Sequence, residues 1–231
     1  MKFTFTKFFS ISSICVLILF TSCIPKENSN NYQTFSQFVG SIVTIENVKY
    51  FRLDADGSLF YSTTFLSDQY ASGDRIIISG SIDYNDQIAG TPYLVTKIDG
   101  VIRINKKMAL SFDSIEKDTF KNDAILGQTW SYIAYTNNQY IYTSKAFINA
   151  SNQYHAFDLV NNRINLNDTL KFEVRHNSKL DAEKTLQVIN ITSYDLTAFL
   201  DTIPPGKTKI IQIAYKTDTR VVKQNISFLA Q

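Results

Sequence analysis

The stretch Val48–Ser62, VKYFRLDADGSLFYS, predicts the architecture of the first half of this chain. Two β-rich runs, Val48–Leu53 and Ser58–Ser62, flank Asp54-Ala55-Asp56-Gly57. Asp-Gly between two such runs is a strong β-hairpin signal, because glycine accepts the positive φ angle that tight turns require. The same four residues resemble the start of a calcium loop, but they lack the third acidic position and the distal glutamate of an EF-hand. We therefore predict a hairpin.

Further β-rich runs around this hairpin predict a small barrel. They are Phe38–Ile45, Arg75–Tyr84, Tyr93–Ile98 and Val101–Ile104, with Asp99-Gly100 as a turn between the last two. Five or six strands without a convincing helix fit a small closed barrel. Gly40 and Gly80 lie inside these runs and mark bends or bulges where such a barrel turns a corner.

The second half predicts a β-sandwich. Thr136–Gln139 separates two β-rich runs and forms another hairpin signal. Seven short strands separated by turns favour a sandwich. They are Trp130–Tyr135, Tyr140–Ser144, Tyr154–Val160, Leu170–His176, Thr185–Thr192, Lys209–Tyr215 and Val221–Leu229. Pro204-Pro205-Gly206 predicts a rigid turn. Ser111–Asn122 is polar and acidic, so we place the domain boundary there, with a barrel at 35–112 and a sandwich at 113–231.

The start of the chain has the form of a secretory signal. Lys2 and Lys7 precede an apolar run, Phe8–Phe20, which is too short to span a bilayer. Thr21-Ser22-Cys23 then resembles the lipobox of bacterial lipoproteins, although Phe20 stands where leucine is usual. This predicts a signal peptide at 1–22, and an acylated cysteine with a flexible tether at 23–34. The alternative is a secreted protein without lipid.

The cysteines and charges limit the chemistry of the mature chain. Cys15 lies in the predicted signal and Cys23 is the predicted acyl site, so the folded part has no thiol for a disulfide, a zinc site or a nucleophile. The whole chain has 23 basic and 21 acidic side chains, and removing Lys2 and Lys7 balances them. A neutral surface argues against nucleic acid as a partner. Lipid chains such as palmitate would attach the protein to a membrane without spanning it.

Catalytic residues are hard to nominate. The chain has two histidines and no Gly-x-Ser-x-Gly elbow. His176 shares a strand face with Phe172 and Val174, which predicts a hydrogen-bonded core histidine, whereas His155 is expected to be exposed or edge-lying. No metal-ligand spacing occurs. We expect no cofactor, no metal and no enzymatic activity.

Aromatic residues offer a candidate ligand surface. Trp130, Tyr132, Tyr140 and Tyr142 are the candidates, because exposed rings stack on sugars and dominate protein hot spots. The alternative is that they pack in the core or pair across strands. Alternation puts Trp130 and Tyr132 on one face and Tyr135 on the other.

Three short patterns resemble the O-glycosylation sequon of Bacteroidetes exported proteins. They are Asp113-Ser114-Ile115, Asp168-Thr169-Leu170 and Asp201-Thr202-Ile203, with Ser114, Thr169 and Thr202 as acceptors. Asp followed by Ser or Thr is also common at strand edges for turn reasons alone.

The order of these features resembles the NigD-like lipoproteins of Bacteroidetes. The resemblance rests on the lipobox at Cys23, the Phe51–Phe60 hairpin, Gly73-Asp74-Arg75, Asp113-Ser114-Ile115, and Phe172-Glu173-Val174-Arg175-His176-Asn177. It implies an N-terminal OB-type barrel, a C-terminal immunoglobulin-like sandwich, and anchoring in the cell envelope, at the outer membrane. It implies no catalytic residues. The family name is linked to a bacteriocin-related locus, which suggests immunity or self-protection.

Three functions follow as hypotheses. The first is a non-enzymatic envelope lipoprotein that presents a protein- or glycan-binding surface. The second is an immunity-type lipoprotein that blocks a toxin, and the third is a hydrolase with an unrecognised site. An exposed Trp130–Tyr142 face would favour a glycan, and a flat apolar patch without a cleft would favour a protein partner. A cleft that gathers His155 or His176 with a serine and an acid would favour an enzyme.

Overall fold

The structure is a computed structural model, and it describes residues 31–67, 69–114, 121–151, 155–162, 169–179, 181 and 186–230. Tyr32–Gln231 forms one compact unit. The predicted signal peptide, Cys23 and most of the tether lie outside the described residues. No helix in the described part of the chain is long and apolar enough to cross a membrane.

The predicted all-β class is confirmed. The described residues form β1 (Tyr32–Ile45), β2 (Val48–Leu53), β3 (Leu59–Tyr61), β4 (Arg75–Asp83), β5 (Tyr93–Met108), β6 (Leu110–Ser111), β7 (Gly127–Thr136), β8 (Gln139–Ala150), β9 (Ala156–Asn161), β10 (Thr169–Asn177), β11 (Leu186–Asp195), β12 (Thr208–Lys216) and β13 (Val221–Leu229). One short α-helix, α1 (Thr197–Leu200), precedes β12, and single 3-10 turns occupy Thr63–Leu66, Tyr84–Asp86 and Phe112–Ser114.

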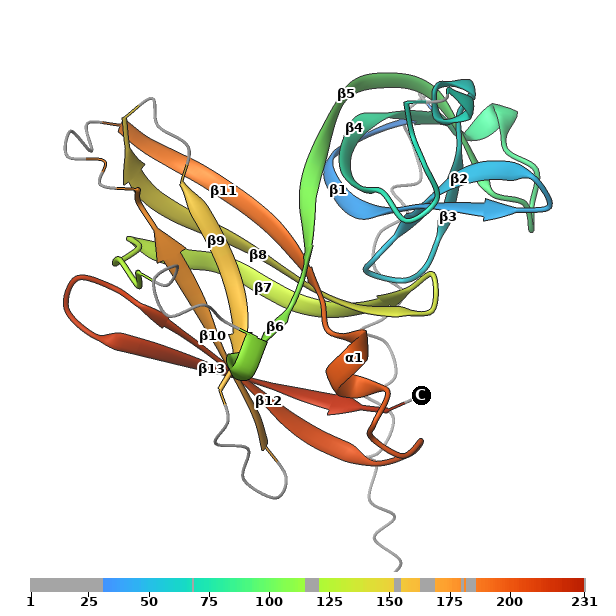
Figure 1. Ribbon diagram of the computed structural model, residues 1–231. Coiled ribbons are helices and arrows are strands. Elements are labelled where there is room, and N and C mark those ends of the chain that lie inside the picture. Colours follow the sequence, from blue (N-terminus) through green and yellow to red (C-terminus); the bar gives the residue numbers. More distant parts are fainter. Residues whose placement is uncertain are drawn as a thin grey trace, which may run out of the picture. The chain divides into compact units, whose positions relative to one another are not determined.

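The first five strands close into a small barrel (Figure 1). They lie in the order β3-β2-β1-β4-β5, and a parallel pairing of β3 with β5 completes the ring. The predicted OB-type architecture also has five strands. The barrel has its own core, which includes Ile42, Phe51, Phe65, Ile76 and Ile78.

The predicted β2–β3 hairpin is confirmed. The Leu53 backbone N–H donates to the Ser58 carbonyl over 2.9 Å, and Gly57 adopts φ = +76°. The Asp56 carboxylate accepts from the Ser58 backbone N–H over 2.9 Å, which is the turn chemistry that aspartate supplies.

Two interior glycines allow strands to approach closely. A Cβ on Gly40 would lie 2.1 Å from the Arg52 carbonyl oxygen, and one on Gly80 would lie 2.3 Å from that of Lys97. Gly80 also lies where the register shifts in the ladders with both neighbouring strands. The prediction of a bend or bulge is confirmed for Gly80, whereas Gly40 lies in regular register with both of its described neighbours, β2 and β4.

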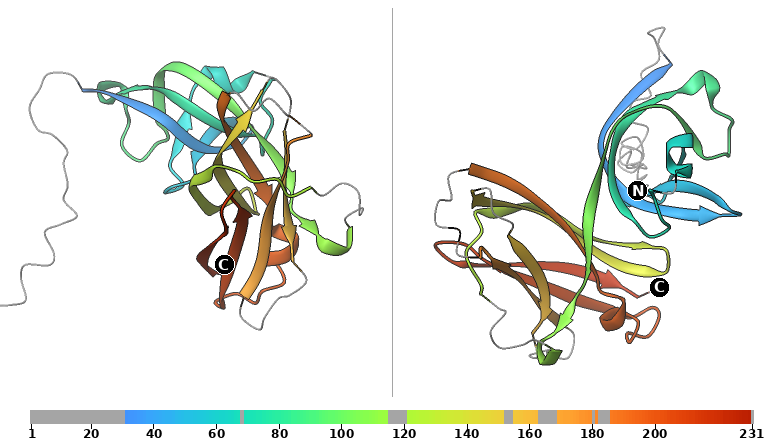
Figure 2. Two further views of the ribbon diagram at one scale, coloured as in Figure 1. Left: turned by 90° about the vertical axis from the view of Figure 1, so that its left-hand side faces the viewer. Right: turned by 45° about the horizontal axis from the view of Figure 1, so that its top comes forward.

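The predicted turn at Asp99-Gly100 is wrong. β5 runs through it as one strand (Figure 2), and Gly100 pairs with Ser79 while Ile98 pairs with Gly80. Asp99 is therefore the extra residue of a β-bulge, which curves the strand without ending it. The last residues of β5, from Asn105, pair with β11, so one strand serves both the barrel and the sandwich. The boundary at residue 113 stays a prediction.

All seven strands predicted for the second half are present as β7 to β13. β5, β11, β8 and β7 continue the barrel sheet, and a second sheet has the order β13-β12-β10-β9-β6. The sandwich core between them includes Tyr142, Leu159, Phe172, Ile211 and Ile213. The pairs β5–β11, β6–β9 and β10–β12 are parallel, whereas both sheets of an immunoglobulin domain are antiparallel. The immunoglobulin-like class therefore stays a prediction.

The two predicted turns of the second half are confirmed. Asn137 and Asn138 adopt φ of +54° and +57° between β7 and β8, as a two-residue hairpin turn requires. Pro204-Pro205-Gly206 forms a turn between α1 and β12, with Gly206 at φ = +76°.

Candidate functional site

A buried ion pair lies where the barrel strands meet the sandwich strands. The Arg75 side chain on β4 is 1% exposed and the Asp54 side chain in the β2–β3 turn is 3% exposed. Both terminal nitrogens of the guanidinium donate to the carboxylate, one of them over 2.6 Å. A bidentate pair of this kind fixes geometry as well as charge.

Every N–H of Arg75 has a partner. Besides Asp54, the guanidinium donates to Ser41 on β1 (2.9 Å), Thr143 on β8 (3.0 Å) and Ser193 on β11 (3.3 Å). An arginine has five side-chain N–H donors, so the group is fully satisfied. Because its partners come from the barrel and from the sandwich, Arg75 ties the two together.

Tyr132 on β7 joins this network from the sandwich side. Its hydroxyl donates to Asp54 over 2.8 Å. Burial, and next the negative charge of Asp54, raise the pKa of Tyr132 above its usual value, so the hydroxyl stays neutral and donating. Trp130 stacks on the Tyr132 ring at 5.6 Å between centroids, with 25° between the planes.

A β-bulge in β1 shapes the facing wall. Phe35 pairs with Gly80 and Phe38 with Ile78, so β1 carries one more residue than β4 here. Gln37 adopts φ = +57°, and its backbone N–H donates to the Ser79 hydroxyl over 3.1 Å. In a regular strand, residues three apart face opposite sides. The bulge instead stacks Phe35 and Phe38 at 4.7 Å.

These features enclose a groove of about 500 Å³, here called the junction groove. Its size falls in the usual range for ligand pockets. The barrel side supplies apolar side chains from the β1 bulge and the β2–β3 hairpin, and the sandwich side supplies two residues from the middle of β7. The lining residues are Gln37, Phe38, Val39, Leu53, Asp54, Ala55, Tyr132 and Ile133. Asp54 is itself a lining residue, and its partner Arg75 is bonded to strands of both the barrel and the sandwich.

The four candidate aromatic residues separate onto two faces. On β7, Trp130 pairs with Lys145 and Tyr132 pairs with Thr143, so the two rings lie on the same face of the strand. Both residues are partly exposed. Tyr140 and Tyr142 face the sandwich core and are 5% and 0% exposed. Tyr140 packs against Phe228 and Tyr142 against Tyr194, as the alternative of core packing predicts.

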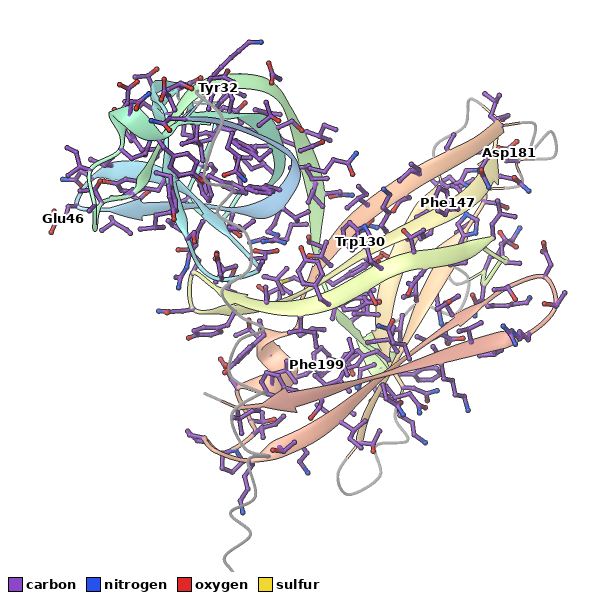
Figure 3. The ribbon with its side chains drawn as sticks, turned by 180° about the vertical axis from the view of Figure 1, so that it is seen from behind. Tyr32, Glu46, Trp130, Phe147, Asp181 and Phe199 are labelled. Atoms are coloured by element: carbon purple, nitrogen blue, oxygen red, sulfur yellow. The ribbon has the colours of Figure 1, made fainter. Side chains whose placement is uncertain are left out.

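The two histidines come together inside the sandwich. His176 is a buried, hydrogen-bonded histidine as predicted, but the expectation that His155 is exposed or edge-lying is wrong. His155 Nδ1 lies 2.8 Å from His176 Nε2, and His155 Nε2 lies 3.0 Å from Asp181 Oδ2. Figure 3 places Asp181 among the loops at one end of the sandwich strands. The segments that carry His155 and Asp181 lie too far apart in sequence for a motif to reveal the pair.

Hydrogen-bond directions fix the protons of this cluster. The Ala124 carbonyl, 3.1 Å away, accepts from His176 Nδ1, so Nε2 of the neutral ring accepts from His155 Nδ1. The Ser151 backbone N–H also donates to Asp181 Oδ2 over 2.6 Å, so this carboxylate joins the loop at Ser151 to the histidine pair.

This cluster is closed to substrates. The side chains of His155 and Asp181 are 2% and 1% exposed. The nearby Ser178 hydroxyl donates to Asp123 over 2.7 Å, so it is engaged with an acid and not with a histidine base. Burial lowers the pKa of His176, and the charge of His155 lowers it further, against the Ala124 hydrogen bond, which raises it. The arrangement can stabilise the fold by hydrogen bonding.

The candidate glycosylation acceptors differ in their surroundings. Thr169 begins β10 and is half-buried, whereas Thr202 is exposed and its hydroxyl donates to the Phe199 carbonyl over 2.9 Å. The side chain of Ser114 and the acyl site Cys23 lie outside the described residues. Within the described ranges, no three His, Cys, Asp or Glu side chains are placed to hold a metal ion.

Solved structures of low sequence identity share this fold. A protein of unknown function, DUF1344, from Bacteroides vulgatus has a TM-score of 0.64 at 15% identity, over 84% of this chain and 90% of that one. A NigD-like immunity protein from Bacteroides caccae has a TM-score of 0.60 at 13% identity, over 86% and 100%. A protein classed as a lipoprotein from Bacteroides fragilis has a TM-score of 0.57 at 16% identity, over 86% and 98%.

No family profile matches the sequence, and comparison with curated proteins finds no match. The predicted resemblance to NigD-like lipoproteins is confirmed at the level of the fold.

Proposed function

We propose that this protein is a non-enzymatic lipoprotein of the bacterial cell envelope that binds a partner protein through the junction groove. The observation that carries the proposal is the groove itself, a preformed and largely apolar site held open by the Arg75–Asp54 pair. Such sites lose little entropy on binding because their walls are already ordered. Acylation at Cys23 would hold the protein at the membrane, and the lipoprotein-like structural neighbour supports this placement.

A protein partner fits better than a glycan. Tyr140 and Tyr142 are buried, so the extended aromatic face that a glycan platform needs is reduced to Trp130 and Tyr132. Apolar side chains continue along the same sheet from the groove. Phe147 on β8 pairs with the exposed Ile189 on β11, and Figure 3 shows Trp130 and Phe147 along this sheet. A groove beside an apolar strip is typical of protein-binding surfaces.

Site-specific photo-crosslinking in cells tests this proposal. A crosslinker at Ala55, which lines the groove and is exposed, should give one discrete adduct with an envelope protein. Ala55→Arg should abolish binding of that partner by filling the groove, whereas the matched control Ala55→Ser should retain it. A crosslinker at Lys223, exposed on β13, should not capture the same partner. Equal capture at both positions, or unchanged binding by Ala55→Arg, would refute the proposal.

Immunity is a second candidate function, favoured by the fold shared with a NigD-like immunity protein. In that case the partner is an antibacterial toxin, and a strain that lacks this protein should be killed by toxin-producing relatives. Wild-type protein should restore survival and Ala55→Arg should not. If the deletion strain survives as well as its parent, the partner is not a toxin, whereas the crosslinking result would still stand.

A further inference from the structure

A second, smaller pocket opens at one end of the barrel and is built mainly from aromatic rings. It has a volume of about 170 Å³, below the roughly 300–1,000 Å³ of sites for drug-sized ligands. Phe35, Phe38, Phe60, Tyr84 and Tyr93 contribute to its wall, and Asp56 contributes a carboxylate. A pocket of this size admits a headgroup, but not a large molecule.

The aromatic rings of this pocket pack against one another. Phe60 stacks on Tyr93 at 5.3 Å between centroids and meets Phe38 edge-on at 5.8 Å. The hydroxyl of Tyr84 donates to the side-chain carbonyl of Gln33, which fixes the position of that ring. Aromatic faces carry the negative part of the ring quadrupole, so a wall of rings attracts a positive charge.

The rim of the pocket also carries a negative charge, from the carboxylate of Asp56. Asp56 is exposed, and its carboxylate accepts a hydrogen bond from the Ser58 backbone N–H. Asp56 forms no salt bridge with any other described residue, and neither lysine nor arginine lines the pocket. The Arg52 guanidinium lies near Gly57, which follows Asp56 in the turn, but it forms no described ion pair with Asp56. The pocket therefore combines aromatic rings with a carboxylate that forms no described ion pair.

We propose that this barrel-mouth pocket binds an alkylammonium group. The ring faces would contact the cation by cation–π attraction, and Asp56 would pair with its charge. Either a small quaternary ammonium compound or a trimethylated lysine side chain of a protein could supply this group. Phe38 and Leu53 also line the junction groove, so a lysine on a protein in that groove could reach the pocket. The inference does not depend on the proposed function, because a free cation can bind when the groove is empty.

Titration of the folded protein, followed by NMR, tests the inference with three probes. Choline and a short trimethyl-lysine peptide carry the cation, and 3,3-dimethyl-1-butanol is the neutral isostere of choline. The cations should shift the signals of the pocket residues, and the neutral isostere should not. Asp56→Asn and Tyr93→Leu should each weaken binding by about three- to tenfold, as expected for one cation contact.

The control Asp218→Asn removes the same charge from an exposed loop outside this pocket and should leave binding unchanged. Binding of choline identifies a small quaternary ammonium compound as sufficient, whereas binding of the peptide alone identifies a trimethylated lysine on a protein. No binding of either cation, equal binding of the neutral isostere, or full affinity in both pocket variants would overturn the inference. Circular dichroism of each variant confirms that it is folded.

Discussion

Removal of the Asp54 carboxylate should destabilise the whole folded unit. In Asp54→Ala, the Arg75 guanidinium stays buried at 1% exposure and loses both of its charged hydrogen bonds. The Tyr132 hydroxyl loses its acceptor at the same time. Removal of one partner of a buried ion pair lowers the free energy of unfolding by about 3–5 kcal/mol, because the remaining buried charge is left without a counter-charge. That is a large part of the 5–15 kcal/mol by which native proteins are typically stable.

Urea unfolding monitored by tryptophan fluorescence measures this cost directly. The chain has one tryptophan, Trp130, and it stacks on Tyr132 next to the ion pair. Arg103→Ala is the matched control, because its pair with Asp74 is 58% exposed at the arginine and should contribute only about 0–1 kcal/mol.

A double variant separates charge burial from simple loss of contacts. Asp54→Leu combined with Arg75→Met removes both charges, and apolar replacement of a buried pair is often neutral or stabilising. The double variant should therefore be more stable than Asp54→Ala. The reasoning is refuted if Asp54→Ala costs no more than Arg103→Ala, because the pair would then be accessible to water.

Three further predictions concern other parts of the chain. Gly80→Ala should lower the free energy of unfolding, measured by chemical denaturation, by about 1–3 kcal/mol, because the new methyl group would meet the Lys97 carbonyl oxygen at 2.3 Å. The control Gly100→Ala places its methyl group where nothing lies within 4 Å, so its stability should differ little from wild type. Burial lowers the pKa of His176 below 6.5 in the folded state, so the unfolded chain binds the proton first. Stability should therefore fall as the pH drops below about 6.5, and thermal melts of His176→Gln should lack that component of the pH dependence. Cys23→Ala should lose palmitate labelling and leave the membrane fraction, and a variant that stays membrane-bound and unprocessed would disprove the lipid anchor.

The strands were predictable because their cause is local. Alternation of apolar and polar residues, as in β12, and β-turn residues such as those of Asn137-Asn138 act over a few positions. Asp99-Gly100 has the same composition as a turn, yet it forms a bulge. The difference is not local, because pairing with β4 on one side continues past the bulge and keeps the strand extended.

The candidate site was only partly predictable, because its parts meet across the fold. Trp130 and Tyr132 were found from their residue type, but Arg75 gave no signal that its partners would come from β1, β8 and β11. The role of Phe38 depends on the bulge in β1, which shifts the register of a single strand. His155 and Asp181 lie at the ends of separate elements, and sequence spacing does not encode their contact.

The arrangement of the junction groove separates stability from specificity. Asp54 lies at its floor and is already bonded to Arg75 and Tyr132, so a ligand cannot recruit it without breaking the network that joins barrel and sandwich. Ala55 is next in sequence, exposed, and makes no such bonds. Changes at the floor should therefore alter folding, and changes at the rim should alter which partner binds. Because the walls are fixed before binding, affinity should follow the contacts that the rim makes and not the cost of ordering the site.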